Sequence, residues 1–271
     1  MKINKILKDK NNIDLKYKIL SNILNKNIVD LKTNKDIKIN IIDYLKYKIK
    51  YNKAKKGYPI QYLFKKAYFY DTEYYVNKNV LIPRPETEIL VNDTIKIINE
   101  KVKNPKIIEI GTGSGIIAIT LKKYINNSII TATDISKKAL KVAKRNAKNK
   151  KQDIEFIKTN LFEGIKERYD VLISNPPYID YSDTNIDKNV KKYEPHLALF
   201  APNEGTYFYE QILKNSKNIL NKKNIILFEI GYNQKELLTK IVNKYYPNSK
   251  IIVKKDYNNY DRIMIISNNI E

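Results

Sequence analysis

The chain of 271 residues contains no cysteine and a single histidine. The lack of cysteine excludes disulfides, thiolate metal sites and a thiol nucleophile. One histidine excludes a histidine-based metal cluster and argues against a histidine-containing catalytic triad. We therefore expect no metal site. We also expect His196 to pack or cap locally and not to act as a catalytic base.

Long apolar runs are also missing, and none approaches the length that spans a membrane. The first 18 residues are interrupted by lysine, Asp9 and Asp14, unlike a signal or transit peptide. The sequence therefore predicts a soluble, cytoplasmic protein without a membrane partner. Hydrophobic residues make up 42% of the chain, enough to form the core of one large domain or two modest ones.

Arginine is scarce, although the net charge is +22 from 51 basic and 29 acidic residues. A charge of this size raises the possibility of a nucleic-acid partner. However, the excess is lysine spread over the whole length, in a chain also rich in asparagine, isoleucine and tyrosine. This pattern favours a bias toward AT-rich codons. We therefore expect no obligatory nucleic-acid partner, with a non-enzymatic RNA-binding module as the alternative.

Residues 1–65 are predicted to form a helical domain. Two stretches repeat apolar residues every four positions, which predicts amphipathic helices with buried apolar faces and lysine and asparagine in solvent. These residues are Leu15, Ile19 and Ile23, and then Ile41, Leu45 and Ile49. Residues 66–82 alternate aromatic and polar side chains around Asp71, which predicts a β-hairpin linker.

Residues 83–271 alternate predicted strands and helices, which indicates a parallel sheet covered on both faces. The strands are expected at residues 106–110, 128–133, 154–158, 169–174, 224–230, 250–254 and 262–267. Only residues 255–261 separate the last two strands, too few for a helical crossover, so these strands should pair antiparallel.

A glycine loop follows the first strand of this sheet and opens a helix. Gly111, Gly113 and Gly115 are three of the seven glycines in the chain. Such clustering predicts a tight backbone that a ligand can approach closely. Asp134 ends the next strand, where a carboxylate can accept hydrogen bonds from ribose hydroxyls. Together these features predict a nucleoside ligand at the carboxyl ends of the strands.

The segment Asn175-Pro176-Pro177-Tyr178 follows the fourth strand. The two prolines lack N–H donors and stiffen the turn, so its carbonyls stay free. The Asn175 side chain and a free carbonyl can accept two hydrogen bonds from one planar NH2 group, with the Tyr178 ring beside it. The segment is typical of a site that holds an amino or amide nitrogen during attack.

This layout resembles class I S-adenosylmethionine-dependent methyltransferases, and more closely the PrmC (HemK) family, which methylates the glutamine of the Gly-Gly-Gln motif in peptide chain release factors. The segments that carry the resemblance span most of the chain: residues 57–62, 81–88, 111–115, 175–179 and 193–199. The resemblance implies a helical domain that docks the substrate (1–65), a hairpin linker (66–82) and a seven-stranded methyltransferase domain with an antiparallel last strand (83–271). A monomer is expected.

The resemblance also implies roles for individual residues. The loop Gly111, Thr112, Gly113, Ser114 and Gly115 would line the methionine end of S-adenosylmethionine. Asp134 would hold the ribose, and Asn160 and Leu161 would contact the adenine, although the family usually has aspartate at position 160. Asn175 and the Pro176 carbonyl would be catalytic, binding the glutamine NH2 group beside the cofactor, with Pro177 and Tyr178 completing the substrate site.

Two enzyme alternatives share these motifs. One methylates an amino group of an RNA or DNA base, which the net charge would favour. The other methylates a glutamine of a ribosomal protein. Neither explains the segment at residues 83–88 as well as a release factor methyltransferase does. The sequence does not indicate which release factor is preferred.

Overall fold

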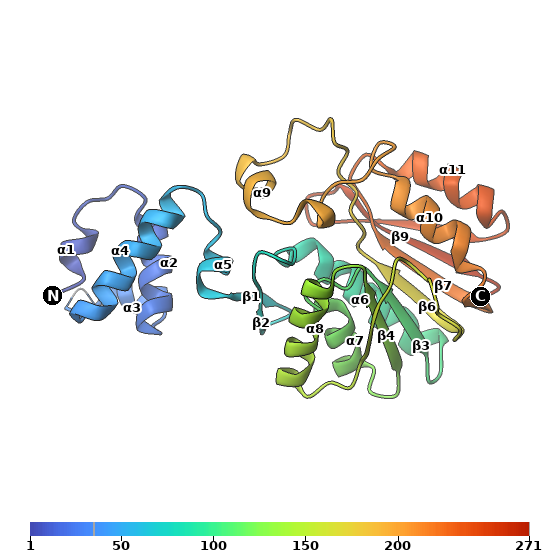
Figure 1. Cartoon of the computed structure of the whole chain (residues 1–271), viewed down its shortest axis with the longest axis horizontal. Helices are drawn as coiled ribbons and strands as arrows, with labels where there is room; N and C mark the ends of the chain where they lie inside the picture. Colours follow the sequence, from blue (N-terminus) through green and yellow to red (C-terminus); the bar gives the residue numbers. More distant parts are fainter. Residues whose placement is uncertain (35, 271) are drawn as a thin grey trace. The chain divides into compact units, whose positions relative to one another are not determined.

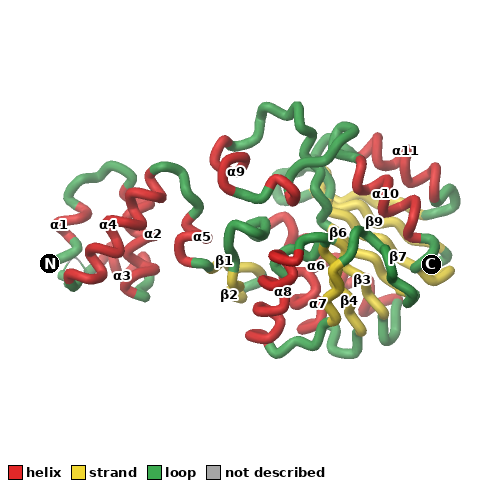
Figure 2. Tube along the Cα trace, viewed as in Figure 1, coloured by secondary structure: helices red, strands yellow, loops and turns green. Residues whose placement is uncertain are grey.

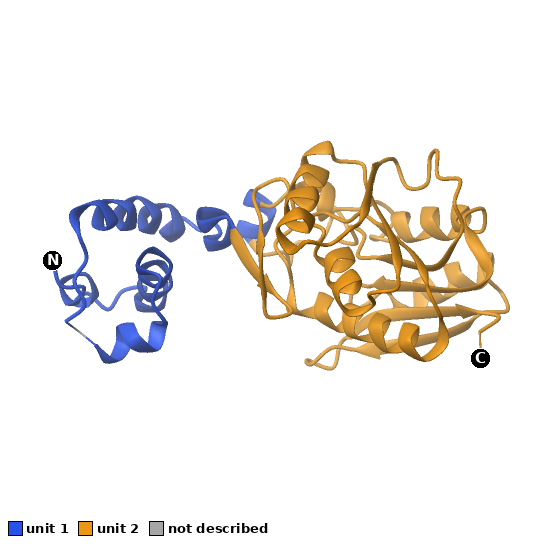
Figure 3. Cartoon of the chain, turned by 90° about the horizontal axis from the view of Figure 1, so that it is seen from below, with its two compact units in different colours: residues 1–65, 188–193 blue, residues 66–187, 194–271 orange. Residues whose placement is uncertain are grey.

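The computed structural model describes residues 1–34 and 36–270, which form two compact units (Figure 3). The first unit comprises residues 1–65 together with residues 188–193. The second comprises residues 66–187 and 194–271. The first unit is helical, whereas the second contains every strand of the described chain, as the yellow segments of Figure 2 show.

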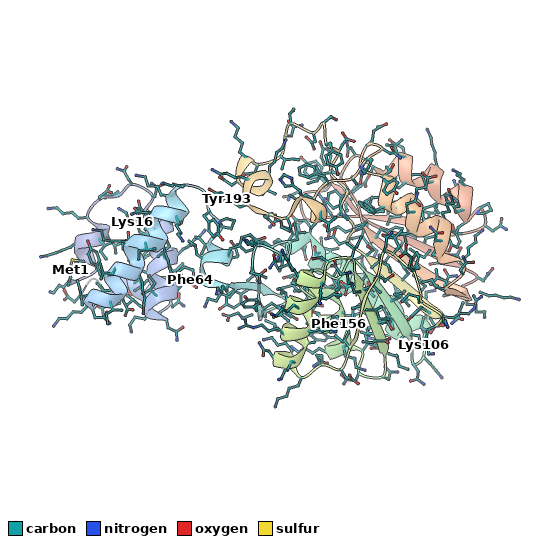
Figure 4. All side chains as sticks on the ribbon, viewed as in Figure 1. Met1, Lys16, Phe64, Lys106, Phe156 and Tyr193 are labelled. Carbon is teal, nitrogen blue, oxygen red and sulfur yellow. The ribbon has the colours of Figure 1, made fainter. Side chains whose placement is uncertain are left out.

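The first unit is built from short helices around a small apolar core. They are α1 (Asn4–Leu7), α2 (Ile13–Leu24), α3 (Ile28–Thr33), α4 (Ile41–Lys55), α5 (Ile60–Phe64) and α9 (Lys188–Tyr193). Asparagine begins two of them, because the side chains of Asn27 and Asn40 accept hydrogen bonds from backbone amides of the first turn. On α2, Ile19 is fully buried, as predicted. Lys16, labelled in Figure 4, is also buried and pairs with Asp9 at 2.9 Å.

The predicted apolar face of α4 is wrong. Ile41, Leu45 and Ile49 are 69%, 53% and 61% exposed. The helix instead buries the face that carries Tyr47, whose ring stacks on that of Tyr51 with centroids 5.5 Å apart. Tyrosine offers a larger apolar area than isoleucine, so a tyrosine face can form the core contact. The aliphatic stripe is left in solvent.

The second unit opens with a hairpin and continues as an alternating α/β domain (Figure 1). Its strands are β1 (Lys66–Phe69), β2 (Thr72–Tyr75), β3 (Lys106–Ile110), β4 (Ile129–Asp134), β5 (Glu155–Lys158), β6 (Tyr169–Ser174), β7 (Leu220–Glu229), β8 (Lys250–Lys255) and β9 (Asp261–Asn268). Its helices are α6 (Pro85–Lys101), α7 (Ile116–Tyr124), α8 (Lys137–Lys150), the 3-10 helix η1 (His196–Ala198), α10 (Tyr207–Ser216) and α11 (Lys235–Tyr245). Tyr70 and Asp71 both have φ 53°, which suits the two-residue turn of the hairpin.

The large sheet has the strand order β5-β4-β3-β6-β7-β9-β8. Strands β3 to β7 are parallel, and β9 pairs antiparallel with both β7 and β8, which confirms the predicted seven-stranded sheet. Strand β7 begins at Leu220, earlier than predicted, because α10 already ends at Ser216. The order reverses between β3 and β6, so a crevice is expected at the carboxyl ends of these two strands.

Neighbouring residues of each strand face opposite helical layers, which explains the continuous apolar runs of the sequence. Ile107 and Val171 pack with α6 and α7, whereas Ile108 and Leu172 pack with α10 and α11. With both faces covered, the polar groups at the strand ends are the ones left for a ligand.

Candidate active site

A cavity of about 340 Å³ lies at the carboxyl ends of β3, β4, β5 and β6. Its lining comes entirely from the second unit and includes Asp134, Asn160 and Leu161, residues 111–114 and residues 175–177. These segments come from four loops, which the parallel sheet brings to one edge. Of the site residues predicted from the sequence, Gly115 and Tyr178 are outside the lining.

The glycine loop is held in place by hydrogen bonds from its backbone amides. The amides of Gly111 and Thr112 donate to the carbonyl of Thr133 at 2.9 and 2.8 Å. Gly113 has φ +57° and a Cβ there would meet nothing within 4 Å, so glycine serves the backbone conformation. At Gly115 a Cβ would lie 3.0 Å from the Cβ of Ala143, so this glycine lets α7 approach α8 closely.

Glu109 lies beneath the loop and is 1% exposed. Its Oε2 accepts hydrogen bonds from the Thr112 hydroxyl at 2.7 Å and from the Ala118 amide at 3.1 Å. Burial raises the pKa of Glu109 to about 7, and the nearby charge of Asp134 acts in the same direction. The carboxyl group therefore joins the loop to the first turn of α7.

Asp134 faces the cavity from the end of β4. Its Oδ2 accepts from the Gly113 amide at 2.9 Å and its Oδ1 from the Ser136 amide at 2.8 Å. Burial raises the pKa of Asp134, while these two hydrogen bonds oppose that shift. Each carboxylate oxygen has a further lone pair, so both can still accept from vicinal hydroxyls.

Asn160 and Leu161 line the far side of the cavity after β5. Leu161 has φ +52°, which turns the chain sharply there. The side-chain Nδ2 of Asn160 donates to Glu163 at 3.4 Å. Its carbonyl oxygen can act as a hydrogen-bond acceptor.

The Asn175 side chain lies at the rim between β6 and α6, where its Nδ2 donates to Thr87 Oγ1 at 3.2 Å. Pro176 and Pro177 continue the cavity wall. The Tyr178 hydroxyl donates to Glu229 Oε1 at 3.4 Å. Burial, followed by the charge of Glu229, raises the pKa of this hydroxyl, so Tyr178 is neutral at physiological pH.

The sequence reasoning missed the side chains that hold this rim. Glu194 is 5% exposed and accepts from the Ile82 amide at 3.0 Å and from Arg84 at 2.6 Å. This contact joins the segment at residues 83–88 to the segment at residues 193–199. Glu229 lies at the end of the apolar strand β7. A carboxylate that closes an apolar run needs a partner, and this signal in the sequence was overlooked.

His196 is exposed, with its ring edge-to-face against Phe200, and does not line the cavity.

Known proteins resemble this chain over most of its length. Residues 87–192 match the family described as Methyltransferase small domain. A release factor glutamine methyltransferase of Mycoplasma mycoides subsp. mycoides is 38% identical over 265 residues, covering 93% of this chain and 91% of the relative. The Staphylococcus aureus protein of the same name is 40% identical over 226 residues, 81% of this chain and 80% of that one.

The chain belongs to the release factor glutamine methyltransferase family. It is therefore a methyltransferase, as the sequence predicted.

Solved structures agree on the fold. A ribosomal protein L11 methylase from Lactobacillus delbrueckii subsp. bulgaricus superposes with a TM-score of 0.53 at 20% identity, over 71% of this chain and 83% of that one. A 16S rRNA N2 G1207 methyltransferase of T. thermophilus, solved with AdoMet and guanosine, superposes with a TM-score of 0.54 at 10% identity, over 75% of this chain and 50% of that one. At this identity the likeness concerns the fold alone.

In residues 1–34 and 36–270 there is no group of three histidine, cysteine or acidic residues that could hold a metal ion. Among the same residues, no helix has the length and apolar character to cross a membrane.

Proposed function

We propose that the chain transfers a methyl group from S-adenosyl-L-methionine to the side-chain amide nitrogen of the glutamine in the Gly-Gly-Gln motif of peptide chain release factors. The observation that carries this proposal is the cavity that joins the glycine loop and Asp134 to Asn175 and Pro176. One wall suits a nucleoside with an amino acid tail, and the adjoining rim suits a planar NH2 group. The names of the relatives support the substrate.

The residues present fit the cofactor. A Cβ at Gly111 or Gly113 would meet nothing within 4 Å, and this open space suits a close ligand. Asp134 would accept from the ribose, and Asn160 and Leu161 would border the adenine. When bound, S-adenosylmethionine supplies an electrophilic methyl group on a sulfonium centre.

The protein's contribution is to position the substrate. An amide nitrogen is a weak nucleophile because its lone pair is delocalised, so it must be held in line with the methyl group. In our proposal Asn175 Oδ1 and the Pro176 carbonyl accept its two N–H bonds. Positioning of this kind can supply about 7–11 kcal/mol of a reaction barrier. The same acceptors would stabilise the positive charge that develops on nitrogen.

Labelled S-adenosylmethionine tests the proposal directly. The protein is incubated separately with a purified release factor, total RNA and ribosomal proteins. We expect label on the release factor glutamine, located by peptide mass spectrometry. Label on RNA alone would assign the site to a base amine, and label on a ribosomal protein alone would assign it to a different protein substrate.

We further propose that the helical unit docks the protein substrate. The stripe of Ile41, Leu45 and Ile49 on α4 supports this, because aliphatic side chains left in solvent are costly unless a partner covers them. Leu45→Lys should raise the KM for the release factor while kcat at saturation is unchanged. An unchanged KM would remove the stripe from the docking surface.

A further inference from the structure

The rim residue Asn175 is held by a buried polar chain that the proposed function does not explain. Glu229 is 1% exposed, and Thr87, in the first turn of α6, is 3% exposed. The Thr87 hydroxyl donates to Glu229 Oε2 at 2.6 Å, and Asn175 Nδ2 lies 3.2 Å from the same hydroxyl oxygen. Tyr178 donates to the other oxygen, Oε1, at 3.4 Å.

We propose that Thr87 and Glu229 are positioning residues that set the orientation of the Asn175 side-chain amide, so that its carbonyl oxygen faces the substrate NH2 group. This inference rests on the proposed function, because it assigns the oxygen that receives the substrate. It extends the catalytic arrangement to two side chains that do not touch the reacting atoms.

The argument is one of hydrogen-bond polarity. A carboxylate only accepts, so Thr87 must give its single hydroxyl proton to Glu229. The hydroxyl oxygen then offers only lone pairs to Asn175, which must turn its NH2 toward Thr87. The Asn175 carbonyl oxygen is thereby directed away from α6. If the Asn175 side-chain amide were turned the other way, its NH2 group would face the NH2 group of the substrate. Both groups are donors, so the substrate amide would lose a hydrogen-bond acceptor.

Groups around Glu229 act on its charge. Burial, the largest effect, raises the pKa of Glu229 above its ordinary value, and the hydrogen bond from Thr87 and the positive charge of Arg262 offset only part of that rise. Arg262 is itself held by Asp256, at 3.1 Å, and by the carbonyl of Ile230, at 3.2 Å. The guanidinium is therefore fixed on β9, where its charge partly offsets the effect of burial; the polarity argument applies to the ionised form of Glu229, above its raised pKa.

The matched variants are Thr87→Val and Thr87→Ser, assayed in the full chain with S-adenosylmethionine and a release factor. Valine keeps the shape and removes the hydroxyl, whereas serine keeps the hydroxyl. We expect Thr87→Val to lower kcat by about tenfold or more, because an oriented hydrogen bond is lost. Cofactor affinity, measured by calorimetry, should stay within about twofold of wild type. Thr87→Ser should restore most of kcat.

Glu229→Gln is the second test, and it decides the matter if the valine variant fails to fold. A carboxamide can donate to Thr87 and reverse the polarity, so kcat should fall while the melting temperature of the Glu229→Gln variant stays near that of wild type. The inference is overturned if Thr87→Val or Glu229→Gln retains wild-type kcat, or if Thr87→Ser is as slow as Thr87→Val. Wild-type protein that methylates only RNA would refute the proposed function instead, and the same kcat ratios on that acceptor would still test Thr87.

Discussion

The two halves of the cavity are built in different ways. In the cofactor half, polar groups are held by neighbours in the chain or in the next strand: Thr112 bonds Glu109 three residues away, and Gly113 bonds Asp134 across 21 residues. In the substrate half, Asn175 bonds Thr87 across 88 residues, and Thr87 bonds Glu229 across 142. The first half depends on backbone amides and local turns. The second depends on side chains that only the complete fold brings together.

The largest effect should come from the substrate half. Asn175→Ala removes the proposed acceptor for the substrate NH2 group, and we expect kcat to fall by about 10²–10³-fold, as for the loss of one preorganised catalytic hydrogen bond. Calorimetry should show cofactor affinity close to wild type, because the loop and Asp134 are untouched. Parallel loss of cofactor binding would mean that the two halves are not separable.

The difference between the halves also explains what the sequence could and could not predict. The sheet, its antiparallel end, the glycine loop and Asp134 were predictable, because strand periodicity and local motifs determine them. Thr87 was recognised only as part of the segment at residues 83–88. The buried face of α4 was predicted wrongly because tyrosine and isoleucine both recur at helical spacing, and periodicity alone does not say which stripe finds a partner.

In the cofactor half, Glu109→Gln should change how stability depends on pH. The folded pKa of about 7 lies above the ordinary value of 4.5, so between these values the folded protein keeps a proton that the unfolded chain has lost. Stability therefore falls as pH rises through this window. The unfolding free energy of wild type should drop, relative to the variant, by on the order of 3 kcal/mol.

Urea unfolding at several pH values measures this difference. Glu167→Gln is the control, because the exposed Glu167 pairs with Lys106, which lowers its pKa and gives a trend of the opposite sign. Equal pH dependence of wild type and Glu109→Gln would show that Glu109 ionises freely beneath the loop.

Asp134→Ala tests the cofactor half at the ligand. Loss of a carboxylate that accepts from the ribose should weaken S-adenosylmethionine binding by about 10- to 100-fold, the range for hydrogen bonds to a charged group. Calorimetry measures the affinity. Asp134→Asn keeps one acceptor oxygen and should lose less. Unchanged affinity in the alanine variant would remove Asp134 from the cofactor site, leaving its role in holding the Gly113 and Ser136 amides.

The smallest effect concerns the scaffold of the substrate half. The guanidinium of Arg84 donates one hydrogen bond to Glu194 at 2.6 Å and a second, from its other terminal nitrogen, to the Ile82 carbonyl at 3.0 Å. Lysine keeps the charge but lacks the planar fork that makes both bonds. Arg84→Lys should therefore lose about 0.5–1.5 kcal/mol of unfolding free energy in urea. Arg168→Lys is the matched control, because its bond to the Leu220 carbonyl is one that lysine can also make. Equal stabilities of the two variants would mean that Arg84 acts only through its charge.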